Sequence, residues 1–95
     1  MAEDPKSEQE RRRYIRLDVS GDVKAFDADG FYIGRVDRVG GGGIQIRLTP
    51  EAGSRSYEIG SLIDIRIVEP GSEEQKFHVE VRDRSGDILG VRFLQ

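Results

Sequence analysis

The stretch that decides the fold is Ile44-Gln45-Ile46-Arg47-Leu48, in which apolar and polar residues alternate. Successive side chains of a β-strand point to opposite faces, so the two isoleucines and the leucine share one face, while Gln45 and Arg47 share the other. This alternation predicts a half-buried antiparallel strand. Downstream of the N-terminal segment, no stretch carries apolar residues three and four positions apart over a helical length. The sequence therefore predicts an all-β fold.

The same alternation recurs on both sides of this stretch. It is regular in the segments 63–67, 77–81 and 89–93, and less regular in 23–26 and 31–36. Turn dipeptides such as Asp29-Gly30 stand between the segments and favour tight turns. Residues 49–61 have turn composition, and we expect them to form a connecting loop.

The number of strands and the length of the chain together favour a closed sheet. A chain of 95 residues is enough for one domain with one core. Hydrophobic residues make up 36% and charged residues 35%, so nearly every apolar side chain must face that core. Six short strands leave no chain for a second layer. A sheet of this kind removes its exposed edge strands by closing into a barrel. We predict a small six-stranded antiparallel β-barrel with a flexible N-terminal arm.

The N-terminal residues and the absence of cysteine indicate in which cellular compartment the protein is expected. Residues 1–10 are acidic and polar, which predicts a disordered tail before a barrel domain at 11–95 that includes the arm. No apolar run there resembles a signal peptide or a membrane span. The chain contains no cysteine, which makes a reducing compartment the simple expectation. We expect a cytoplasmic protein without membrane insertion.

The sequence offers little for catalysis. His78 is the only histidine and falls on the polar side of its strand, as expected of a surface residue. One histidine without cysteine cannot supply the nitrogen or sulfur ligands of a zinc site. The acidic residues are scattered, which is typical of a solubilised small barrel. We expect no enzyme activity, no catalytic residue, no metal and no cofactor.

Two features carry binding chemistry, and the first is the arginine cluster of the arm. Arg11, Arg12, Arg13 and Arg16 lie within six residues of one another. A guanidinium group matches phosphate oxygens bidentately, and it also matches the O6 and N7 acceptors of guanine. The alternative interpretation is a solvated charged segment, and the cluster by itself favours that alternative.

The second feature is an aspartate followed by glycines in the segment 36–44, which we interpret as a polar turn. Asp37 can accept hydrogen bonds from the N1 and N2 edge of guanine, and the glycines at 40–43 let the backbone approach a flat ligand. The alternative is a glycine-rich turn with a bulge, in which the aspartate bonds its own backbone two residues on.

Together these features resemble the PilZ domain family, whose cyclic di-GMP site combines an RxxxR motif with a (D/N)xSxxG motif. Arg12 and Arg16 satisfy RxxxR, with Arg11 before them. By this resemblance Arg12 and Arg16 would bind the phosphates and the guanine Hoogsteen edges, with Arg11 assisting. The final segment, 88–93, also resembles the last barrel strand of the family.

The second motif departs from the family pattern at one position. Asp37 and Gly42 occupy the aspartate and glycine positions, but Val39 stands where the family has serine. Loss of one neutral hydrogen bond is worth about 0.5–1.5 kcal/mol. The fourth glycine leaves open whether Gly42 or Gly43 closes the motif. The resemblance covers residues 10–95 and implies cyclic di-GMP as the ligand.

The leading hypothesis is a stand-alone receptor for this bacterial second messenger. Ligand binding would order the arginine arm and change the surface shown to an unidentified effector protein. The family binds the ligand as one molecule or as an intercalated pair, and the sequence does not choose between them. The rival is a degenerate PilZ adaptor that binds no nucleotide and acts through protein contact alone.

A third and weaker hypothesis is a barrel that binds single-stranded nucleic acid. Such barrels need aromatic platforms on a basic face. The net charge is -3, and most of the aromatic residues occupy apolar positions of the expected strands. We therefore expect neither DNA nor RNA as a partner.

Overall fold

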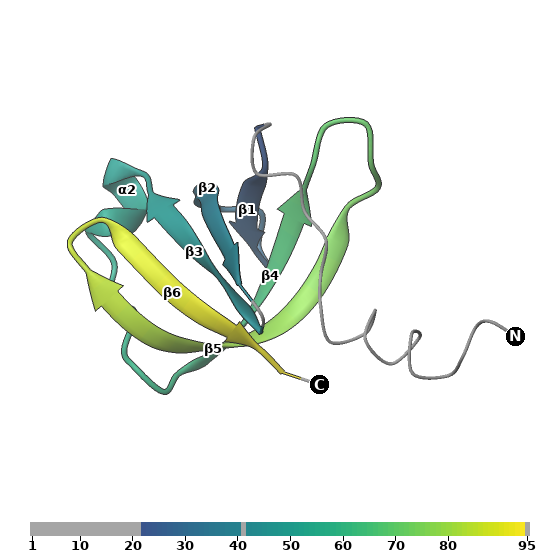
Figure 1. The fold of residues 1–95 in the computed structure, drawn as a ribbon. Helices are drawn as coiled ribbons and strands as arrows, with labels where there is room; N and C mark the ends of the chain where they lie inside the picture. Colours follow the sequence, from purple (N-terminus) through teal and green to yellow (C-terminus); the bar gives the residue numbers. More distant parts are fainter. Residues whose placement is uncertain (1–21, 41, 95) are drawn as a thin grey trace, which may run out of the picture.

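A computed structural model describes residues 22–40 and 42–94 (Figure 1). The strands in them are β1 (Lys24–Asp27), β2 (Tyr32–Gly40), β3 (Gly43–Leu48), β4 (Leu62–Val68), β5 (Gln75–Ser85) and β6 (Ile88–Phe93), with a short helix α2 (Pro50–Gly53) after β3. All neighbouring strands are antiparallel, and they close in the order β1-β2-β3-β6-β5-β4. The predicted six-stranded barrel is confirmed. The acidic tail and the arginine arm lie outside the described residues.

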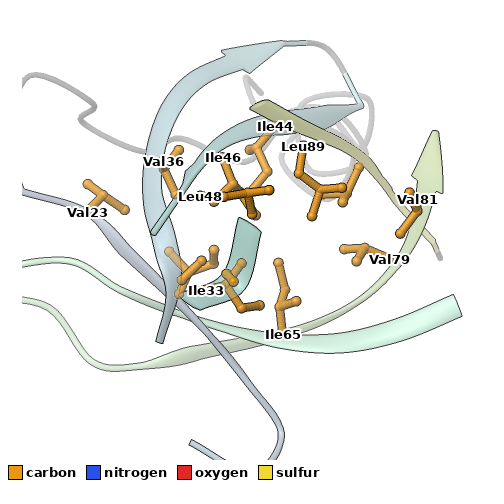
Figure 2. Close-up of a cluster of buried hydrophobic side chains, with 14 residues drawn as sticks. Val23, Ile33, Val36, Ile44, Ile46, Leu48, Ile65, Val79, Val81 and Leu89 are labelled. Atoms are coloured by element: carbon orange, nitrogen blue, oxygen red, sulfur yellow. The ribbon is translucent and has the colours of Figure 1, made fainter. Parts of the chain in front are cut away.

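The inward faces of the strands form one apolar core. Ile44, Ile46 and Leu48 are buried, as the alternation of their segment predicts. Figure 2 shows their side chains meeting those of the opposite strands in the barrel interior. The described residues include no buried polar or charged side chain. Burial of branched aliphatic groups, at roughly 25 cal/mol per Å² of apolar surface, therefore holds the barrel closed.

The segment predicted as a loop between β3 and β4 contains the helix α2, so that prediction was wrong in part. Thr49 caps the helix, because its Oγ1 accepts a hydrogen bond of 3.1 Å from the backbone N–H of Ala52. Pro50 occupies the first turn, where its missing N–H costs nothing. Ala52 is buried against the barrel. Four residues are too few to show helical periodicity, so only the Thr-Pro cap signals this helix in the sequence.

The turn predicted after Asp37 is shorter than expected, because β2 continues through the aspartate to Gly40. Val36 pairs with Ile46 and Arg38 pairs with Gln45, so Asp37 is the extra residue of a β-bulge. The strands pair up to Gly40 and Gly43, which leaves two residues between them. The bulge absorbs the aspartate within the strand and keeps the hairpin closed.

The hairpin between β1 and β2 forms as predicted. Gly30 has a φ of 90°, a left-handed conformation that glycine adopts without strain. The carboxylate of Asp27 accepts hydrogen bonds of 2.9 Å from the backbone N–H groups of Asp29 and Phe31. This aspartate stabilises the turn through its own backbone, as is typical of the residue.

Candidate ligand site on the outer face of the β2–β3 hairpin

Asp37 presents its carboxylate on the outer surface of the barrel. Arg47 of β3 lies 3.5 Å from it, measured from Nη2 to Oδ2, and the same guanidinium reaches Asp87 at 3.5 Å through Nη1. The side chains of Asp37 and Arg47 are 43% and 51% exposed, so solvent screens the pair and its net stabilisation is small. No described backbone N–H donates to Asp37, in contrast to Asp27. The carboxylate is therefore accessible to a ligand.

Val39 does not join Asp37 on this surface. It pairs with Ile44, is partly buried and packs against the core cluster. The bulge at Asp37 sets this orientation, because it shifts the alternation so that Arg38 faces outward and Val39 inward. Of the predicted motif, Asp37 and Gly42 remain on the hairpin exterior, while Val39 belongs to the interior.

Gly42 and Gly43, which the sequence left as alternatives, differ in their surroundings. A Cβ on Gly43 would lie 2.1 Å from the carbonyl oxygen of Val91 in β6, so the close approach of the strands requires glycine there. A Cβ on Gly42 would meet no atom within 4 Å, and its φ is not positive. The Gly42 carbonyl accepts a hydrogen bond of 2.7 Å from Phe93, which any residue could do. Nothing in the described barrel requires glycine at position 42.

Sequence reasoning missed a shallow hollow beside these residues. It measures about 190 Å³, and we call it the glycine hollow; its lining consists of Arg38, Gly40, Gly43, Ile44 and Gln45. The sequence signal for it was the polar face of β3, on which Gln45 lies. The hollow adjoins the bulge through Arg38, the residue next to Asp37.

A larger hollow lies on a different face, around β4 and β5. It measures about 280 Å³ and is lined by Ala28, Asp64, Ile65, Arg66, Lys76, Phe77 and His78. The Nδ1 atom of His78 contacts the carboxylate of Asp64, and both side chains are mostly exposed. As predicted, His78 is a surface residue, and here it serves as the cross-strand partner of an acid.

The described residues contain neither a cluster of metal-binding side chains nor a helix that could span a membrane. They contain no group of three or more histidine, aspartate or glutamate residues arranged to hold a metal ion. Within 22–40 and 42–94, no helix has the length and apolar character needed to cross a membrane.

The described chain begins close to the bulge. Val23 accepts a hydrogen bond of 2.8 Å from the backbone N–H of Val36, the residue just before Asp37. On the β1-facing edge of β2, no described residue pairs with Asp37 or with the strand residues that follow it. The three arginines predicted to bind ligand, Arg11, Arg12 and Arg16, lie outside the described residues, on the chain that leads into this point.

Comparison with known proteins identifies one family. The model of the PilZ domain matches residues 10–95, a range that includes the arginine arm and all six strands. Searches of curated proteins and of solved structures found no match. The match spans nearly the whole chain, and PilZ domains are ligand-binding and adaptor modules rather than catalytic ones. The chain belongs to the PilZ domain family.

Proposed function

We propose that the protein is a cyclic di-GMP receptor that signals through an effector protein in the cytoplasm. The observation that carries this proposal is a PilZ domain whose hairpin combines an accessible aspartate, Asp37, with a glycine, Gly42, that the barrel itself does not need. Glycine loses more conformational entropy on folding than any other residue, so a glycine without a structural reason points to a ligand.

Each proposed contact follows from the chemistry of the ligand. Asp37 accepts from the N1 and N2 groups of a guanine, because a carboxylate is a pure acceptor. Gly42 lets the flat base lie close to the backbone. Arg12 and Arg16 bind the phosphates and the guanine Hoogsteen edges, with Arg11 assisting.

The length of the connecting chain supports a shared site for the arm and the hairpin. Val23, which bonds to Val36 next to the bulge, lies seven positions along the chain from Arg16. A chain of that length spans at most about 25 Å, so Arg16 cannot lie far from the hairpin. A dianionic ligand held between them would neutralise the arginines and order the arm, which changes the surface offered to the effector.

Calorimetric titration with cyclic di-GMP tests the proposal, with GTP and cyclic di-AMP as controls for nonspecific anion binding. Arg12→Ala and Arg16→Ala should each cost roughly 1.5–3 kcal/mol of binding free energy, the value of a charge-assisted contact. Arg82→Ala is the matched control, since Arg82 is an exposed arginine of β5 outside the site. Equal affinity in the wild type and both arm variants would remove the arm from the mechanism.

One observation favours the second candidate function, an adaptor that binds no nucleotide. Val39 replaces the serine of the family motif and packs toward the core, so the motif offers one hydrogen-bonding group fewer. In that case calorimetry would give no heat at high micromolar cyclic di-GMP. The proposed receptor requires saturable binding that is selective for cyclic di-GMP over cyclic di-AMP.

A further inference from the structure

Two polar side chains that line the glycine hollow have no side-chain partner in the described part of the barrel. Arg38 and Gln45 face each other across β2 and β3 as register partners on the outer face. Neither side chain makes a hydrogen bond or an ion pair with any residue in the described ranges. Other arginines of the described barrel, such as Arg84 and Arg92, are held by carbonyls or carboxylates. The described barrel therefore leaves both side chains of this hollow available for a ligand.

We propose that Arg38 and Gln45 form a guanine-recognition subsite of the barrel itself. The proposal rests on the function proposed above for the identity of the nucleotide. It adds two specificity residues that lie outside the arginine arm and outside the aspartate and glycine of the hairpin motif.

The donor and acceptor pattern of the pair fits guanine. The Arg38 guanidinium matches the O6 and N7 acceptors bidentately. The Gln45 amide can donate to O6 through its NH₂ group and accept from N1–H through its carbonyl oxygen. On adenine, an amino group replaces O6 and would oppose the donors of Arg38. Gln45 can turn its amide over and pair with either purine, so Arg38 carries the discrimination.

The floor of the hollow suits a flat base. Gly40 and Gly43 line it without side chains, and Gly43 cannot be replaced because of its approach to Val91. A Cβ on Gly40 would meet no atom, so the surface above this residue is open. A hollow of about 190 Å³ has room for one base, but not for a whole cyclic dinucleotide. The subsite therefore takes one guanine of the ligand, and the phosphates and the other guanine are left to the arm.

The test combines two titrations on the full chain. In the first, ¹⁵N NMR follows the Gly40, Gly43 and Gln45 amide signals while GMP or AMP is added to millimolar concentration. In the second, calorimetry measures cyclic di-GMP affinity for the wild type, Arg38→Ala and Gln45→Ala. Arg82→Ala and Gln75→Ala serve as controls, because both residues are exposed on β5 and lie outside the hollow.

The subsite predicts that GMP shifts the hollow signals more than AMP does, and that Arg38→Ala removes this preference. Both hollow variants should weaken cyclic di-GMP binding by roughly tenfold, the equivalent of one good hydrogen-bonded contact, while the controls bind as the wild type. Unchanged affinity in both hollow variants, with the wild type binding, would overturn the subsite and leave the receptor intact. A GMP preference at the hollow without cyclic di-GMP binding would support the subsite and contradict the receptor. Absence of both signals would overturn both.

Discussion

The two hairpins β2–β3 and β5–β6 are built alike, yet the fold explains only one of them fully. Each joins its strands by two residues, and each carries one bulge residue, Asp37 in β2 and Arg82 in β5. In β5–β6, Gly86 has the positive φ of 61° that its turn requires. In β2–β3, Gly42 has neither a positive φ nor a crowded neighbour. The fold accounts for the glycine of the β5–β6 turn, whereas Gly42 is accounted for by the proposed ligand site.

The charged residues of the two hairpins show the same contrast. In β5–β6, Arg84 donates to the carbonyl oxygens of Gly86, Arg55 and Gly53 at 2.9–3.2 Å and so ties the hairpin to α2 (Figure 1). In β2–β3, Arg38 has no partner among the described residues. Arg84 stabilises the fold, whereas Arg38 is available for the proposed subsite as far as residues 22–40 and 42–94 are concerned.

The largest effect should come from Gly43→Ala. Its Cβ would stand 2.1 Å from the Val91 carbonyl oxygen, so β3 and β6 must move apart. We expect the free energy of unfolding to fall by about 2–3 kcal/mol, as measured by urea denaturation. If Gly42→Ala proved equally destabilising, the distinction between the two glycines would be wrong.

Arg84→Ala should be the next most damaging change. It removes three hydrogen bonds to carbonyl groups and a contact with the Tyr57 ring at 5.9 Å. With partial replacement by water, the loss should be about 2 kcal/mol in the same denaturation experiment. The matched variant Arg38→Ala should change stability by less than about 0.5 kcal/mol. Comparable losses in both variants would contradict the contrast between the hairpins.

Substitution of the turn glycines Gly86 and Gly42 by alanine should change the free energy of unfolding in opposite directions. Gly86→Ala forces a left-handed conformation on alanine and should cost about 1–2 kcal/mol. The Cβ of Gly42→Ala would meet no neighbouring atom, and the φ at this position suits alanine. The substitution lowers the conformational entropy of the unfolded chain, so it should raise the free energy of unfolding by up to about 1 kcal/mol. The same Gly42 variant should bind cyclic di-GMP more weakly. Wild-type affinity in a stable Gly42→Ala protein would exclude this glycine from the site.

The smallest expected effect is the pH dependence of stability that Tyr57 contributes from the loop beside the β5–β6 hairpin. Burial raises the pKa of Tyr57 above its usual 10.0, although the nearby Arg55 partly offsets the change. The folded state therefore holds the phenol proton more tightly than the unfolded state does. This contribution to stability is intact below pH 10.0 and is lost as pH rises through the higher pKa of the folded state. Tyr57→Phe should flatten the decline of the urea midpoint above pH 10.0, and an unchanged decline would contradict this assignment.

The sequence predicted the barrel well because alternation and turn composition are local signals. In the segment from Ile44 to Leu48, the apolar residues face the core and the polar residues face outward, as the alternation indicates. The orientation of Val39 could not be predicted, because one bulge residue reverses every later side chain of the strand. The glycine hollow was missed for a related reason: Arg38 and Gln45 meet only through cross-strand register, which spacing along the chain does not reveal. The short helix α2 lacks the length that periodicity requires.

The difference between Gly42 and Gly43 also bears on how such a protein can evolve. Substitution of Gly43 disrupts the packing of β3 against β6. Selection for a folded barrel therefore eliminates such a substitution, whatever the protein binds. Substitution of Gly42 leaves the barrel intact and touches only the proposed ligand surface. A lineage that no longer uses the nucleotide can therefore lose its response by a single change and keep a working adaptor. A nucleotide receptor and an adaptor that binds no nucleotide can then differ by a single codon on the same barrel.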